Sequence, residues 1–86
     1  MAKYKLTYKK SVNKDLRSIP NQDVTRIRMR IEALAENPRP VDCKKLVGQE
    51  RYRVRQGIYR IIYEIRDHEL LVAVIRVGHR GSVYKQ

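Results

Sequence analysis

The N-terminal half of the chain changes from a strand pattern to a helix pattern. In YKLTY, residues 4–8, apolar and polar residues alternate, which predicts a half-buried β-strand. Residues 9–19, and then the segment that opens at Asn21, carry apolar residues at helical spacing. The prolines of NPRP, residues 37–40, end the second helix, because proline lacks a backbone N–H and disfavours helix in the residue before it. The clearest helical positions are Val24, Ile27, Ile31 and Leu34.

The C-terminal half has the pattern of a β-sheet. Residues 52–55 and 58–65 flank Gln56-Gly57, a break short enough for a hairpin. A polar turn over residues 66–69 is followed by the almost purely apolar run LLVAVIRV, which suits a central strand with both faces covered. Residues 37 to about 47 are expected to form an irregular loop.

These elements predict an α+β fold with the order β-α-α-β-β-β. Two helices from the N-terminal half are expected to cover one face of a three- to four-stranded antiparallel sheet. With 86 residues, the chain is expected to be a single domain, residues 1–86. Cys43 stands alone and the two histidines lie apart, so we expect neither a disulfide framework nor a metal site.

The alternation of side chains along a strand places basic residues together in the predicted hairpin. Arg53 and Arg55 share one face of their strand, and Val54 lies on the other. If the helices cover the side of Val54 and Ile61, then Arg53, Arg55 and Arg60 gather on the uncovered face. Such a cluster favours an anionic ligand, and a solvated sheet face is the alternative.

The charge of the chain supports a polyanionic partner. Twenty Lys and Arg residues against nine Asp and Glu residues give a net charge of +11, and the excess is concentrated in the C-terminal half. This balance favours nucleic acid or an acidic protein segment over a generic basic protein. The opening MAKYKLTYKK lacks the apolar run of a signal peptide, and no stretch approaches a membrane span. We therefore expect a cytoplasmic protein without a membrane partner.

Three stretches resemble the RelE/ParE toxin superfamily. They are YRVRQGIYRIIYEI at residues 52–65, RVGHR at residues 76–80 and VYK at residues 83–85. The resemblance covers nearly the whole chain, because the first strand, the helical pair and the proline-containing loop also arrive in family order and at family length.

The RelE branch of this superfamily implies a specific activity. RelE-like toxins enter the ribosomal A site and cut mRNA there, using the 2′-OH of the RNA to attack the adjacent phosphate. Such a reaction requires proton transfer, positive charge on the transition state and in-line alignment. The resemblance implies a metal-independent endoribonuclease, or mRNA interferase, that inhibits translation without a cofactor.

The resemblance also implies roles for individual residues. Arg53 and Arg55 occupy the positions of an alternating basic pair, and Arg60 matches the arginine that binds the scissile phosphate. Arg80 matches the arginine assigned to the leaving group, and Tyr84 matches the C-terminal tyrosine that stacks on or orients the nucleotide. Further contacts to RNA are expected from Lys44, Lys45, Arg51, His79 and Lys85.

One departure from the family pattern concerns the proton acceptor. The best-known RelE type has lysines at the first pair, whereas this chain has Arg53 and Arg55, which essentially cannot lose a proton. Proton removal is then left to water, to the RNA or to His79. Because His79 directly precedes Arg80, it would point to the opposite side in an extended segment.

The resemblance leaves other functions open and implies partners. The alternatives are a ParE-like inhibitor of DNA gyrase and a non-catalytic module that binds RNA or the ribosome. The expected partners are a cognate antitoxin, mRNA and the ribosome, with operator DNA contacted only through the antitoxin complex.

Overall fold

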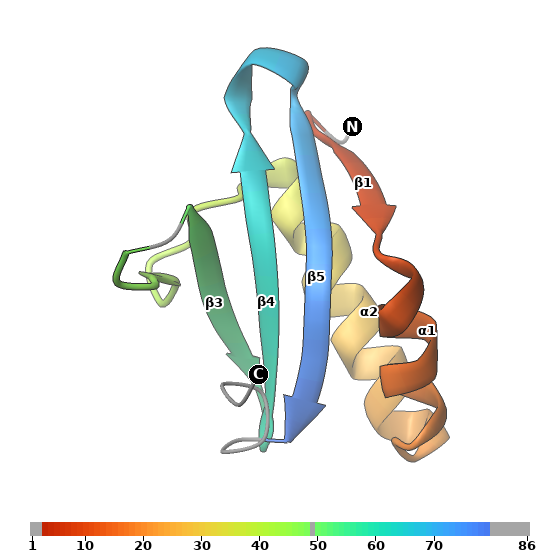
Figure 1. Cartoon of the computed structure of the whole chain (residues 1–86). Coiled ribbons are helices and arrows are strands. Elements are labelled where there is room, and N and C mark those ends of the chain that lie inside the picture. Colours follow the sequence, from red (N-terminus) through yellow and green to blue (C-terminus); the bar gives the residue numbers. More distant parts are fainter. Residues whose placement is uncertain (1–2, 49, 80–86) are drawn as a thin grey trace.

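The computed structural model describes residues 3–48 and 50–79, which form two α-helices and five strands (Figure 1). None of these helices is long and apolar enough to cross a membrane. The elements in chain order are β1 (Lys5–Tyr8), α1 (Lys10–Arg17), α2 (Asn21–Glu36), β2 (Lys44–Lys45), β3 (Arg51–Gln56), β4 (Tyr59–Arg66), a short 3₁₀ helix (Asp67–Glu69) and β5 (Leu71–His79).

The strands form one mixed sheet in the order β1-β5-β4-β3-β2. β1 runs parallel to β5, and the other neighbours are antiparallel. The predicted α+β class and both helices are confirmed, but the prediction of a three- to four-stranded antiparallel sheet was wrong in strand number and in the direction of β1. The crossover through both helices allows β1 to lie parallel to β5. β2 has only two residues, too few to show an alternating pattern in the segment expected to be a loop.

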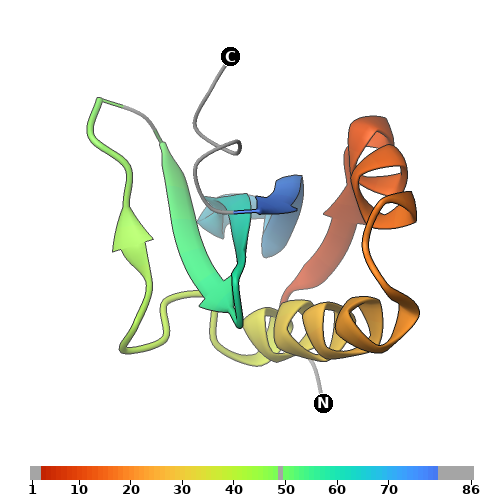
Figure 2. The same ribbon diagram turned by 90° about the horizontal axis from the view of Figure 1, so that it is seen from below.

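The helices bury one face of the sheet in a common core. Figure 2 shows α2 lying across this face, with α1 on the side of β1 and β5. The helices contribute Val12, Leu16, Ile27, Ile31 and Leu34 to the core. The strands contribute Val54, Ile61, Tyr63, Val72, Val74 and Val77. The residues chosen by period-two alternation in the hairpin therefore face the helices as predicted.

A two-residue turn connects β3 and β4. The ladder continues to the pair Gln56 and Tyr59, so the turn consists of Gly57 and Ile58, one position later than the predicted break. Gly57 has a φ of +61°, and the φ of Ile58 is not positive. A type II′ turn has this combination, with glycine as the first of its two central residues. This turn fixes the register of the residues on both faces of the hairpin.

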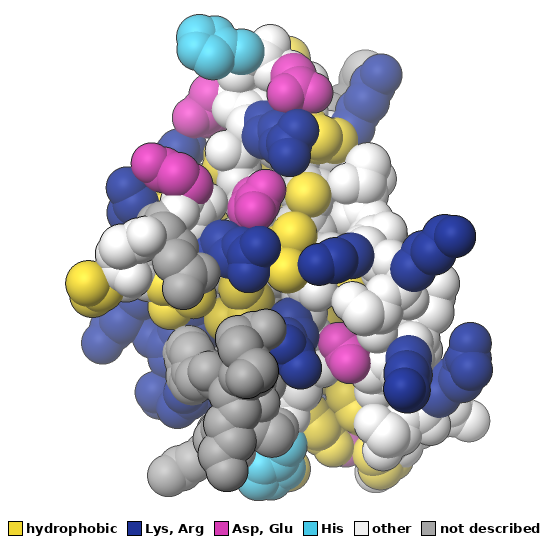
Figure 3. All heavy atoms as spheres, viewed as in Figure 1, with side chains coloured by type: hydrophobic (Ala, Val, Ile, Leu, Met, Phe, Trp, Pro, Cys, Tyr) yellow, Lys and Arg dark blue, Asp and Glu magenta, His cyan; other side chains and the backbone are white. Residues whose placement is uncertain are grey.

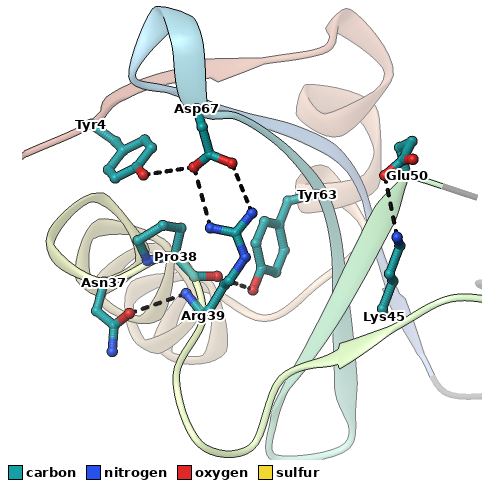
Figure 4. Close-up of polar contacts among 8 residues, drawn as sticks. All are labelled: Tyr4, Asn37, Pro38, Arg39, Lys45, Glu50, Tyr63 and Asp67. Atoms are coloured by element: carbon teal, nitrogen blue, oxygen red, sulfur yellow. Dashed lines mark hydrogen bonds and ion pairs between the residues drawn. The ribbon is translucent and has the colours of Figure 1, made fainter.

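Side chains join the sheet to the other elements at both ends. Asp15 of α1 accepts a hydrogen bond from the backbone N–H of Val77 at 3.1 Å, beyond the point where β1 ends. At the other end, Arg39 donates two hydrogen bonds to Asp67, which also accepts one from the Tyr4 hydroxyl (Figure 4). These contacts connect segments that are distant in the sequence.

Candidate functional site

Two arginines lie side by side on the sheet face that α2 leaves uncovered. Arg55 of β3 and Arg60 of β4 are direct partners in the antiparallel ladder, so both side chains are on the same face. Arg55 is exposed and Arg60 is half-buried. Together with Gly57, Ile58 and Tyr59 they line a small hollow of about 90 Å³, which we call the arginine hollow.

Arg53 lies on the same face but is much less accessible. It is only 6% exposed, and its ladder partner Ile62 is 4% exposed. On its other side it pairs with Lys44 of β2, whereas Ile62 pairs with Arg76 of β5. The open face therefore carries a row of Lys44, Arg53, Ile62 and Arg76 beside the pair Arg55 and Arg60. Figure 3 views this face and shows Lys and Arg side chains around a band of hydrophobic ones.

Sequence reasoning gave Arg76 no role, although the structure places it in this row. The available signal was a single charge inside the apolar run LLVAVIRV. Arg76 is half-buried and lines a second hollow, of about 310 Å³, with Tyr59 and His79 among its other residues.

Two of the predicted RNA-contact residues, Arg51 and Lys45, hold ion pairs within the protein. Arg51 lies opposite Glu64 in the ladder and pairs with it at 3.3 Å. Glu64 also pairs with Arg66 at 3.6 Å. Lys45 pairs with Glu50 at 3.4 Å, and both side chains are mostly exposed (Figure 4). The exposed pair of Lys45 with Glu50 is weak, so Lys45 remains able to meet a polyanion, whereas Arg51 is held by the partly buried Glu64.

His79 lies on the face opposite the arginine pair. It is the ladder partner of Tyr59, and the two rings meet edge to face with centroids 6.2 Å apart. The Tyr59 hydroxyl points to α2, where it donates a hydrogen bond to Asp23 at 3.4 Å. Desolvation, together with the Asp23 carboxylate, raises the pKa of Tyr59 and keeps this phenol a donor. The ladder thus places His79 on the helix side, away from Arg55 and Arg60.

The remaining predicted site residues are at the C-terminus. Arg80, Tyr84 and Lys85 lie outside the described residues, so their assigned roles stay predictions. Within the described part of the chain, no group of three or more His, Cys, Asp and Glu side chains could hold a metal ion. This face can therefore supply several positive charges to a bound anion.

Comparison with known proteins shows the family to which the chain belongs. A family model described as the ParE toxin of type II toxin–antitoxin systems, parDE, matches residues 6–84. The chain belongs to this toxin family, within the RelE/ParE superfamily.

Relatives named as RelE toxins cover almost the whole chain. RelE1 of Methanocaldococcus jannaschii is 31% identical over 87 residues, which cover 96% of this chain and 97% of RelE1. Toxin RelE3 of the same organism is 34% identical over 85 residues, covering 93% of this chain and 94% of RelE3. In the crystal structure of the archaeal RelE–RelB complex from Pyrococcus horikoshii OT3, a chain aligns with a TM-score of 0.82 and 29% identity. The alignment covers 92% of this chain and 97% of that one. The fold is therefore RelE-like.

Proposed function

We propose that this toxin is a ribosome-dependent endoribonuclease that cleaves mRNA in the ribosomal A site. The observation that carries the proposal is the pair Arg55 and Arg60, which line one hollow on the open sheet face. Two guanidiniums around one small hollow suit a phosphodiester, because each presents a planar set of donors to phosphate oxygens.

The proposed reaction uses the RNA as its own nucleophile. The 2′-OH attacks the adjacent phosphorus and loses its proton, the P–O5′ bond breaks, and the 5′ oxygen takes up a proton. The products are a 2′,3′-cyclic phosphate and a 5′-OH end. Arg60, with Arg55 beside it, would stabilise the charge that develops on the equatorial oxygens. The need for a 2′-OH makes the enzyme act on RNA and not on DNA.

The described arginines of this face can supply positive charge, but they do not supply a general base. The guanidiniums of Arg53 and Arg55 offer hydrogen-bond donors and no acceptor, and His79 lies on the other face of the sheet. Buried Arg53 would support the floor of the site, while the proton of the 2′-OH leaves to water or to the RNA. Arg80 and Tyr84 complete this proposal as the leaving-group and stacking residues assigned by sequence.

A cognate antitoxin is the partner that the comparisons support. The P. horikoshii relative was solved as a RelE–RelB complex. We propose that an antitoxin holds this toxin inactive in the cytoplasm by covering its basic face, and that operator DNA is contacted only through that complex. The net charge of +11 favours an acidic antitoxin segment on this face.

Inhibition of DNA gyrase is the second candidate function. It is favoured by the match of residues 6–84 to the ParE toxin model. A supercoiling assay with purified gyrase separates the two candidates, because a gyrase inhibitor would block supercoiling and leave translated mRNA intact.

The test of the proposed function is cleavage in a translation reaction. Wild-type toxin should release 5′-OH fragments from translated mRNA, and Arg60→Gln should reduce the cleavage rate at least about tenfold, as expected for the loss of one charge-stabilising group. Arg17→Gln is the matched control, because Arg17 is an exposed arginine in the last turn of α1. Equal cleavage by Arg60→Gln and Arg17→Gln would remove Arg60 from the site.

A further inference from the structure

A third hollow lies on the helix side of the β3–β4 turn. It has a volume of about 290 Å³, and we call it the turn hollow. Its lining residues are Asp23, Arg26, Gln56, Gly57, Ile58 and Tyr59. The arginine hollow shares the last three of these residues, so the two hollows lie on either side of the same turn. Ile58 stands between them and is 54% exposed.

The ladder explains why the two hollows differ in chemistry. Gln56 and Tyr59 are partners on the helix side, and the next pair, Arg55 and Arg60, is on the open side. The turn hollow therefore has one cation from Arg26, one carboxylate from Asp23 and one amide from Gln56. With these charges balanced, it attracts a phosphate far less than the arginine hollow does.

The turn hollow suits a flat, neutral and polar ligand. Gln56 offers both a donor and acceptors, Arg26 offers donors, and Asp23 offers acceptors. These are the side-chain types that read the edges of nucleobases. Ile58 and the Tyr59 ring supply the apolar surface that a base plane requires. The hydrogen bond from Tyr59 to Asp23 at 3.4 Å ties this wall to α2.

We propose that the turn hollow is a nucleobase subsite for the nucleotide whose phosphate lies in the arginine hollow. The backbone of the RNA would pass over the turn at Ile58, with the phosphate on one side and the base on the other. Gln56 and Arg26 are then specificity-determining residues. This inference rests on the proposed function in one respect only, that the ligand is RNA.

The test is an NMR titration of the free protein with four nucleoside 3′,5′-bisphosphates that differ only in the base. Inorganic phosphate is the reference, and it should shift signals of Arg55 and Arg60 alone. We expect the bisphosphates also to shift signals of Gln56, Ile58 and Arg26, with affinities that differ among the four bases by roughly fivefold or more, as for one good base contact.

Two variants on one helix sharpen the test. Arg26→Gln should remove most of the difference among the four bases. Arg28→Gln is the matched control, since Arg28 is exposed on α2 and does not line the hollow. It should weaken all four bisphosphates equally and keep their ranking.

The outcomes separate this inference from the proposed function. Four equal affinities, shifts confined to Arg55 and Arg60, or no binding of any bisphosphate would overturn the nucleobase subsite, whatever the cleavage assay shows. Base-dependent binding that Arg26→Gln abolishes would support the subsite even if translated mRNA is not cut. In that case the proposed function fails and the binding site remains.

Discussion

Arg55 and Arg60 lie directly opposite each other across the β3–β4 ladder, on the face that α2 leaves uncovered. Like charges in this arrangement destabilise a sheet. A phosphate bound between the two guanidiniums would offset this repulsion.

The repulsion between Arg55 and Arg60 should be measurable in the free energy of unfolding. Arg55→Gln should raise the free energy of unfolding by about 0.2–1 kcal/mol at low salt, because it removes a like charge opposite Arg60. The gain should shrink when sulfate or phosphate is added, because these anions bind the wild-type pair. Thermal unfolding followed by circular dichroism, with and without phosphate, measures both effects. A variant less stable than wild type at low salt would contradict this account of the pair.

A buried hydroxyl joins β4 to the loop after α2. Tyr63 is fully buried, and its hydroxyl donates a hydrogen bond to the carbonyl oxygen of Pro38 at 2.6 Å (Figure 4). Tyr63→Phe should lower the free energy of unfolding by about 1–3 kcal/mol, because the buried carbonyl loses its partner. Chemical denaturation measures the change. Tyr8→Phe, at a half-buried tyrosine of β1, is the control and should change stability by less than about 0.5 kcal/mol.

The contact between Asp15 and Val77 should hold α1 against β5. Asp15→Ala leaves the Val77 amide without its acceptor, so the free energy of unfolding should fall by about 1–3 kcal/mol. Hydrogen exchange at the Val77 amide should accelerate in the same variant. Asp15→Asn keeps an acceptor oxygen and should retain most of the protection. Unchanged exchange in Asp15→Ala would show that the contact does not protect this amide.

The contact of Asp67 with Arg39 and Tyr4 predicts sensitivity to acid. The hydrogen bonds from Arg39, followed by that from Tyr4, hold the pKa of Asp67 below its ordinary value. Because the folded pKa is depressed, the stabilisation is present above the unfolded pKa of about 3.9 and is lost as the pH falls through the folded value. Chemical denaturation at several pH values between 2 and 6 gives the free energy of unfolding at each pH. This free energy should fall more steeply with decreasing pH for wild type than for Asp67→Asn. Glu36→Gln, at the end of α2, should keep the wild-type slope.

The face of each hairpin residue could be predicted because alternation along a strand is a local property. Val54 and Ile61 face the core, and Arg53, Arg55 and Arg60 face the other way, as the pattern indicated. The same rule placed His79 on the helix side once its ladder partner Tyr59 was known.

Properties that depend on distant segments could not be predicted in this way. The parallel pairing of β1 with β5 results from how the chain crosses over, and no residue of β1 encodes it alone. Arg53 is buried while Arg55 is exposed, although the alternation along the strand places both on the same face. The turn hollow joins residues of α2 to residues of the β3–β4 turn, which are about thirty positions apart.

The most direct test of the central claim is mapping of mRNA ends after the toxin is induced. Primer extension on a translated mRNA should show new ends that carry a 5′-OH, and the same RNA without ribosomes should stay intact. Arg60→Gln should reduce the amount of these ends at least about tenfold, while Arg17→Gln should leave it unchanged. Intact translated mRNA during toxin-induced growth arrest, together with inhibition of gyrase supercoiling, would contradict the account.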